Sequence, residues 1–315
     1  GVLSLCLVVM IVIAMILQFY MMGRKRFNYL DSGTEQVVPK KVSRSASALL
    51  SAVSGIFSLV ALGIPIGSSF IMSFSNSFSI ERFAFTLDNY KNVLQPDGAL
   101  LEGIRNSLSL AAVAAVVGLM LGFAVAYTLT YSQFKLKRLI DMLTLVAMAV
   151  PGVVLGIGYI FVWNQKWLQP LGLNLYGKPE ILILASVASA VPLINRVLVG
   201  GMSKVPQELL VASQVQGARL GKRLKTVLLP LLHSSMVSAV LAAFGGSVFN
   251  LAITTILYPP NYSTLPVYIS DSYNDLNFGY AAAATMVGGA FIIAIMLLLE
   301  FILNFGKRSG HADNT

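Results

Sequence analysis

The side chains that most often bind metals or catalyse reactions are scarce in this sequence of 315 residues. The two histidines, His233 and His311, lie far apart, and the single cysteine, Cys6, lies in an apolar run. None of them has the spacing of zinc ligands, and the phosphate-binding pattern G-x-x-x-x-G-K-[ST] does not occur. The sequence therefore predicts no catalytic residue, no metal site and no cofactor, so that the energy source for any work lies elsewhere.

Polar residues inside apolar stretches are the remaining candidates for chemistry. Arg196 lies about seven residues, or about two helical turns, from the end of its stretch. There its guanidinium could either reach the lipid headgroups or line a path. Glu300 lies at a similar depth and is its candidate partner, whereas Asp141 follows Lys137 and Arg138 at the i+4 and i+3 spacings of a local helix pair. Further candidates for a path lining are Asn195, Asn250 and Thr254.

Proline and glycine interrupt the stretch that contains Pro151 and Gly152. Such a pair can kink a membrane helix and leave backbone carbonyls free beside a path. Alternatively, Gly152 only permits close packing between helices. Both interpretations stay open for this stretch, while the spacing of Gly118 and Gly122 favours packing.

These residues lie within long apolar stretches, and the mean hydropathy of the chain is +0.77. A helix needs about 20 apolar residues to cross the hydrocarbon core, and seven stretches meet that length. They are 2–22, 49–74, 107–131, 142–163, 181–203, 227–251 and 278–305. Short helices are also expected in the segments 76–105 and 258–278. The sequence thus predicts an all-α integral membrane protein.

The distribution of basic residues predicts the orientation. If the first stretch runs inward, 16 of the 22 Lys and Arg residues fall in cytoplasmic segments, as the positive-inside rule requires. The net charge of +9 then reflects topology and contact with membrane lipid, and no nucleic acid is expected as a partner. We expect a transmembrane helix over 1–22, a cytoplasmic basic linker over 23–48, a six-span domain over 49–305 and a cytoplasmic tail over 306–315.

One cytoplasmic loop, 203–230, contains the polar sequence VASQVQGARLGKRLKTVLLP at residues 211–230. A short helix is predicted before Gly217, which can adopt a positive φ and end that helix. Pro230 lacks an N–H group and suits the first turn of the next helix. The residues with the spacing of one helical stripe are Glu208, Val211, Ala212 and Val215.

This loop resembles the pattern E-A-A-x-x-x-G-x(9)-I-x-L-P of the permease subunits of binding-protein-dependent ABC importers. Four residues match the pattern without gaps: Ala212, Gly217, Leu229 and Pro230. Ser213 and Val227 are mild changes, whereas Val211 replaces the usual glutamate, for which Glu208 is the candidate substitute. The resemblance implies that the loop, including Ala218, docks onto a cytoplasmic ABC ATPase and couples it to transport.

The segments FTLDNYKNVL, AVPGVVLGIGY and LYPPNYSTLPVYI resemble the iron(III) branch of that family, which is related to thiamine, polyamine and phosphonate permeases. The resemblance implies a MetI-like six-span domain with one additional helix, similar to the second half of a tandem permease. It also implies a bacterial plasma (inner) membrane location, a second six-span half, an extracytoplasmic binding protein, and ferric iron or another small polar solute as substrate. The alternatives are an ion-gradient-driven secondary transporter, which would need acidic residues near mid-membrane, and a membrane enzyme.

Overall fold

The computed structural model describes residues 9, 10, 13, 43–76, 84–95 and 98–312. Apart from residues 9, 10 and 13, the expected first span lies outside these residues, and so does most of the basic linker. The described part is built of helices, together with one isolated antiparallel bridge between Ser75 and Phe85. The prediction of an all-α protein is confirmed for this part of the chain.

The described residues contain five continuous helices that are long and apolar enough to cross a membrane, and one bent pair of helices that meets the same length and composition together. The bounds of the spans agree with the expected stretches to within a few residues at most ends. The continuous ones are α2–η1–α3 (Arg44–Ser58, Leu59–Gly63 and Ile64–Ser73), α5 (Ala99–Tyr131), α8 (Pro179–Met202), α10–η4–α11 (Leu220–Arg223, Leu224–Leu228 and Leu229–Val248) and α14 (Phe278–Ala312). The first of these begins inside the expected linker, because Ser43 caps it by accepting a hydrogen bond from the Ala46 N–H at 3.3 Å.

The bent span consists of α6 (Lys137–Ala149) and α7 (Gly152–Trp163), which meet at an angle of 108°. Pro151 causes the break, because the residue before a proline is pushed out of the helical region, and Val150 is indeed extended with ψ 125°. The predicted kink is therefore confirmed, and it is sharp enough to turn the chain through more than a right angle.

Three helices, α5, α8 and α11, form the centre of the bundle, and their apolar side chains share a buried cluster. Glycines let α5 approach α8 closely: a Cβ on Gly122 would lie 2.7 Å from Ile194 Cγ2, and one on Gly118 would lie 3.1 Å from Ala190 Cβ. The packing role that the sequence indicated for these two glycines is confirmed.

Two spans contain a single π-turn just before a proline. Pro65 follows the π-turn Leu59–Gly63, and Pro230 follows the π-turn Leu224–Leu228. A proline inside a helix lacks a donor and its ring clashes with the carbonyl four residues earlier. The wider π-turn accommodates both problems, so each helix continues through its proline.

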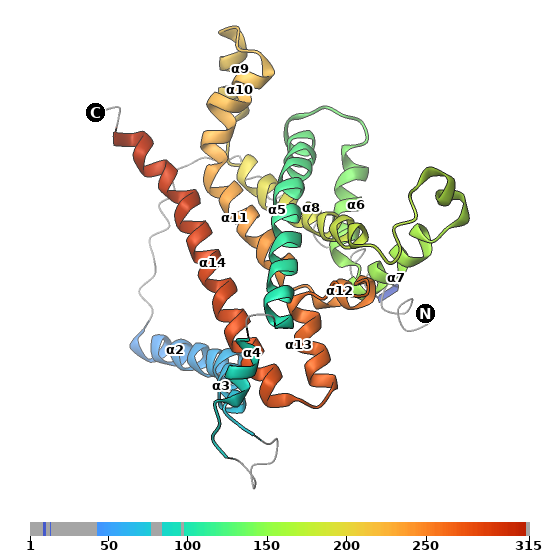
Figure 1. The fold of residues 1–315 in the computed structure, drawn as a ribbon. Helices are drawn as coiled ribbons and strands as arrows, with labels where there is room; N and C mark the ends of the chain where they lie inside the picture. Colours follow the sequence, from blue (N-terminus) through green and yellow to red (C-terminus); the bar gives the residue numbers. More distant parts are fainter. Residues whose placement is uncertain (1–8, 11–12, 14–42, 77–83, 96–97, 313–315) are drawn as a thin grey trace.

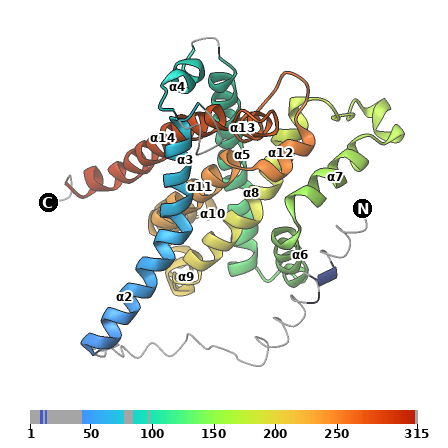
Figure 2. The ribbon, with the colours of Figure 1, turned by 90° about the horizontal axis from the view of Figure 1, so that it is seen from below.

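Short helices connect the spans at the end of the bundle opposite α9, where α4, α12 and α13 lie (Figures 1 and 2). The expected helices in segments 76–105 and 258–278 are confirmed. The elements here are α4 (Asp88–Val93), α12 (Leu251–Leu257) and α13 (Leu265–Asn274), and a further short helix, the 3-10 helix η3 (Lys166–Leu171), follows α7.

Candidate functional site: a projecting helix and two polar contacts

The helix α9 (Gln207–Val215) projects together with α10 from the body of the bundle, at the same end as the loop between α5 and α6 (Figure 1). It begins directly after Pro206, and Glu208 lies in its first turn. A carboxylate there interacts favourably with the positive end of the helix dipole. The expected short helix in the loop 203–230 is thus present.

A Schellman turn ends α9. Gly217 has φ +80°, its N–H donates to the carbonyl of Gln214 at 2.9 Å, and the N–H of Ala218 donates to the carbonyl of Ser213 at 3.1 Å. These two bonds satisfy carbonyls that would otherwise lack donors at the helix end. The predicted positive φ of Gly217 is confirmed, and Ala218 is identified as the residue that closes the turn.

The solvent-facing side of α9 is partly apolar. Val215 is 83% exposed and Val211 is 50% exposed, and Glu208 and Ala212 are exposed beside them. These four residues have the stripe spacing that the sequence indicated. An exposed stripe of apolar and small residues on a projecting helix is typical of a binding surface.

The opposite side of α9 is anchored to the bundle. Leu210 is only 6% exposed and belongs to the same buried cluster as Leu228 and Leu232. In addition, Arg223 Nη1 donates to Gln214 Oε1 at 3.0 Å, which ties α9 to α10. A displacement of α9 would therefore act on the core of the bundle.

Pro230 lies in the first turn of α11, as predicted, but α11 continues the helix that begins at Leu220. The loop is thus shorter than expected, because the π-turn lets the helix extend through Leu229 and Pro230. Ser213, the remaining loop candidate, is half-buried and its hydroxyl donates to the Leu210 carbonyl at 2.8 Å.

The path candidates separate into two groups. At the first, α7 packs on α12: a Cβ on Gly152 would lie 2.9 Å from Ala252 Cβ, and the Asn250 side chain accepts from the Ile253 N–H at 3.1 Å as the cap of α12. Thr254 donates back to the Asn250 carbonyl. Close packing accounts for Gly152 and local capping for the polar pair, next to the break at Pro151.

At the second group, Arg196 on α8 pairs with Asp141 on α6 through an N–O distance of 2.6 Å. Two sequence interpretations are therefore wrong: Arg196 does not pair with Glu300, and Asp141 does not pair with Lys137 or Arg138. The reason is that α6 crosses α8 with its Asp141 face inward, so the guanidinium of another helix lies nearer than the neighbours along the same helix.

Thr144 completes this second group and was missed from the sequence. Its hydroxyl accepts from Arg196 Nη2 at 3.3 Å and from Asn195 Nδ2 at 3.4 Å, and it donates to the Asp141 carbonyl at 2.9 Å. Its spacing of three from Asp141 puts both on one face of a helix, which was the available indication.

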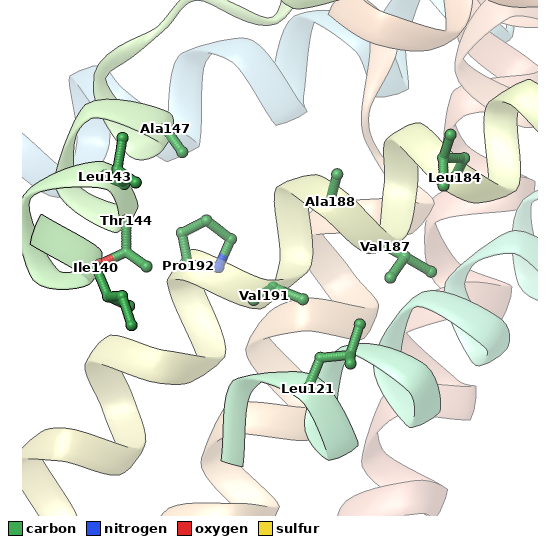
Figure 3. Close-up of a pocket in the computed structure, with 10 residues that line it drawn as sticks. All are labelled: Leu121, Ile140, Leu143, Thr144, Ala147, Leu184, Val187, Ala188, Val191 and Pro192. Carbon is green, nitrogen blue, oxygen red and sulfur yellow. The ribbon is translucent and has the colours of Figure 1, made fainter. Parts of the chain in front are cut away.

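An open pocket of about 380 Å³ lies beside this group, between α5, α6 and α8 (Figure 3). Its lining is apolar except for Thr144. The lining residues are Leu121, Ile140, Leu143, Thr144, Ala147, Leu184, Val187, Ala188, Val191 and Pro192.

Comparisons with known proteins agree with this architecture. Residues 114–308 match the family model described as "binding-protein-dependent transport system inner membrane component". The ferric transport system permease protein FbpB of Actinobacillus pleuropneumoniae is 26% identical over 75% of this chain, which spans 34% of that relative's length. A protein of Salmonella paratyphi A named as the 2-aminoethylphosphonate transport system permease protein PhnV is 28% identical over 85% of this chain and 98% of its own length.

Solved structures show the same fold. A bacterial ABC transporter for the import of alginate contains a chain with a TM-score of 0.64 and 16% identity, covering 84% of this chain and 96% of its own. A chain of the MetNI methionine ABC transporter gives a TM-score of 0.50 and 18% identity over 67% of this chain. By its helices, its projecting loop and its match over most of the six-span region, this chain belongs to the family of binding-protein-dependent transport system inner membrane components and is a permease of an ABC importer.

Proposed function

We propose that this permease imports ferric iron or another small polar solute, and that an ATPase docked on the loop 203–230 drives the import. The observation that supports the coupling role best is the projecting α9, with Glu208, Val211 and Val215 exposed and the turn at Gly217 fixing its end. An apolar stripe with one acidic residue suits a groove on a soluble partner.

The second proposed link is mechanical. Leu210 connects α9 to the buried cluster that includes Leu198 of α8 and Leu232 of α11. Close-packed interiors transmit displacements because they deform little. Closure of the ATPase subunits would therefore move α9 and, with it, the spans that surround the proposed path.

The proposed substrate class rests on the relatives. Their names indicate ferric iron and 2-aminoethylphosphonate, which are both small and highly polar. A solute of this kind needs polar groups along an otherwise apolar route. In this chain we assign that role to Asn195 and Arg196, and we place Pro151, Gly152, Asn250 and Thr254 near the route as its structural border.

The exposed apolar surface of α2 supports a proposal for further protein partners. No residue of α2 is buried, and its large apolar side chains need lipid or another protein against them. We propose that a second six-span half covers part of this surface, that a binding protein delivers the solute at the end carrying α4 and α13, and that the C-terminus lies in the cytoplasm of a bacterium.

The test is transport by the purified permease, with its partner half, in proteoliposomes. Uptake of radioactive ferric iron should require the ATPase, ATP and the binding protein, and an imposed proton gradient should not replace them. Uptake that follows the proton gradient without ATP would refute the proposal and favour a secondary transporter. Ferric iron and 2-aminoethylphosphonate are supplied with their respective binding proteins, so that the solute class is tested separately.

A further inference from the structure

Three of the four hydrogen bonds between α6 and α8, within the described residues, come from a single guanidinium. Arg196 Nη2 donates to Asp141 Oδ1 at 2.6 Å, to the Asp141 carbonyl at 3.1 Å and to Thr144 Oγ1 at 3.3 Å. Asn195 Nδ2 adds a longer contact to Thr144 at 3.4 Å. We call this set of residues the α6–α8 polar contact. Bonds between a charged donor and a carboxylate are the strongest of the ordinary hydrogen bonds.

Little else fixes α6 in place. None of its residues is buried, and apolar side chains along it, such as Leu139 and Val146, are exposed. At its far end, the chain bends by 108° at the Val150–Pro151 break. A helix that ends at a sharp break and is weakly packed can rotate as a unit about that break.

The polar contact lies next to one end of the pocket, with which it shares Thr144. The pocket lining on α8 runs from Leu184 to Pro192 (Figure 3). Asn195 and Arg196 occupy the next turn of that helix. On α6, Thr144 belongs to both the lining and the contact. Since α8 continues from Arg196 to Met202 and then toward α9, the contact lies on the side of the pocket nearer the proposed ATPase-docking loop.

Two buried atoms in the contact lack partners. Asn195 has no exposed surface, and its Oδ1 has no hydrogen bond; the Nε of Arg196 is likewise buried without a partner. Unpaired buried polar atoms disfavour the arrangement that contains them. The ion pair offsets this cost, so the hydrogen bonds of the α6–α8 polar contact hold α6 against α8. A helix held in this way can change position when a modest free energy is supplied.

We propose that Asp141, Thr144 and Arg196 form the inner gate of the solute path, and that α6 is the element that moves when the gate opens. This inference rests on the proposed import function and deepens it, since it assigns the gate to one ion pair. Arg196 and Asp141 act here by holding α6 against α8, and the 380 Å³ pocket becomes continuous with the cytoplasm when they separate.

The experiment measures the accessibility of a cysteine in the pocket. Val191→Cys is introduced on α8, one turn before Asn195, in the full chain with Cys6→Ala and with its partner half. Inverted membrane vesicles expose the proposed cytoplasmic side to a charged, membrane-impermeant maleimide. Asp141→Asn should raise the labelling rate about tenfold, the change that 1.4 kcal/mol produces. Labelling from the opposite side, in right-side-out vesicles, should change by less than about twofold.

A double-mutant cycle tests the pairing itself. Asp141→Asn and Arg196→Gln should each raise the rate, and the double variant should label no faster than either single one. If Arg196→Gln does not accumulate in the membrane, Arg196→Met, which removes the charge but keeps an unbranched side chain, replaces it in the cycle. Arg138→Gln on the same helix is the matched control and should leave the rate unchanged.

Three results would overturn the gate: unchanged labelling in Asp141→Asn, effects of the two substitutions that multiply in the double variant, or an equal effect of Arg138→Gln. The labelling requires neither ATPase nor solute. A permease that labels as expected but does not respond to ATP would refute the proposed function alone, whereas ATP-driven import with unchanged labelling would refute the gate alone.

Discussion

Gly217 offers the sharpest test of the docking loop, because the structure separates two effects that a larger side chain could have at this position, a steric clash and backbone strain. A Cβ built there has no atom within 4 Å, so a larger side chain would meet free space. The backbone, however, has φ +80°, a conformation that costs an L-residue about 1–2 kcal/mol, and more for a β-branched one. If Gly217→Val relieves this strain by leaving the Schellman turn, the population with α9 correctly ended falls about 5–30-fold.

The assay is the affinity of the purified ATPase for the permease in lipid nanodiscs, measured together with solute-stimulated ATP hydrolysis. Gly217→Val should weaken both by the factor above, while Gly217→Asn should have a smaller effect because asparagine tolerates positive φ. Gly221→Ala is the matched control: its Cβ also meets open space, but it lies in α10 with ordinary helical φ. Equal affinities for valine, asparagine and wild type would show that the turn at Gly217 does not set the docking geometry.

Three further outcomes are expected. Glu208→Lys should weaken ATPase binding about tenfold or less, as a surface charge reversal does, whereas Lys178→Ala at the opposite end should have no effect in the same titration. Gly122→Val should lower the thermal midpoint of the detergent-solubilised protein, because its Cβ would lie 2.7 Å from an α8 side chain and overpacking costs about 1–3 kcal/mol; an unchanged midpoint would contradict the tight α5–α8 contact. In intact cells that carry the permease with Cys6→Ala, an impermeant maleimide should label the Gly172→Cys variant but not the Gly221→Cys variant. The reverse labelling pattern would show that the predicted orientation is wrong.

The spans and the turn at Gly217 were predictable because both depend on local composition. About 20 apolar residues are required to span a bilayer whatever the tertiary structure, and glycine at the end of a helix favours positive φ without help from distant residues. The closely packed pair Gly118 and Gly122 followed for the same reason, since their spacing puts both on one helix face.

The ion pair could not be predicted in the same way. The spacing of Asp141 from Lys137 and Arg138 satisfied the local rule, and the depth of Glu300 suited Arg196. Which partner is chosen depends on how α6 is rotated relative to α8, and that rotation is set by the break at Pro151. The sequence indicated a break there but did not give its angle of 108°.

The unbroken run of Leu220–Val248 was missed for a related reason. Proline is usually a sign that a helix has just begun, and Pro230 was assigned that role. A π-turn over Leu224–Leu228 removes the conflict between the proline ring and the preceding turn. The helix therefore begins at Leu220, ten residues before Pro230. Leu220 and Gly221 therefore lie on a helix that is rigidly continuous with α11, not on a loop.

This continuity links the docking loop to the proposed gate. Closure of the ATPase would push on α9, whose buried Leu210 packs in one cluster with Leu198 of α8 and Leu228 of η4. Ile194 belongs to the same cluster and directly precedes Asn195 and Arg196. A displacement of α6 from α8 by about one hydrogen-bond length would be enough to separate a guanidinium and a carboxylate that are now 2.6 Å apart. The rigid packing that would transmit a displacement of α9 to α8 therefore also places the ion pair where a small displacement can break it.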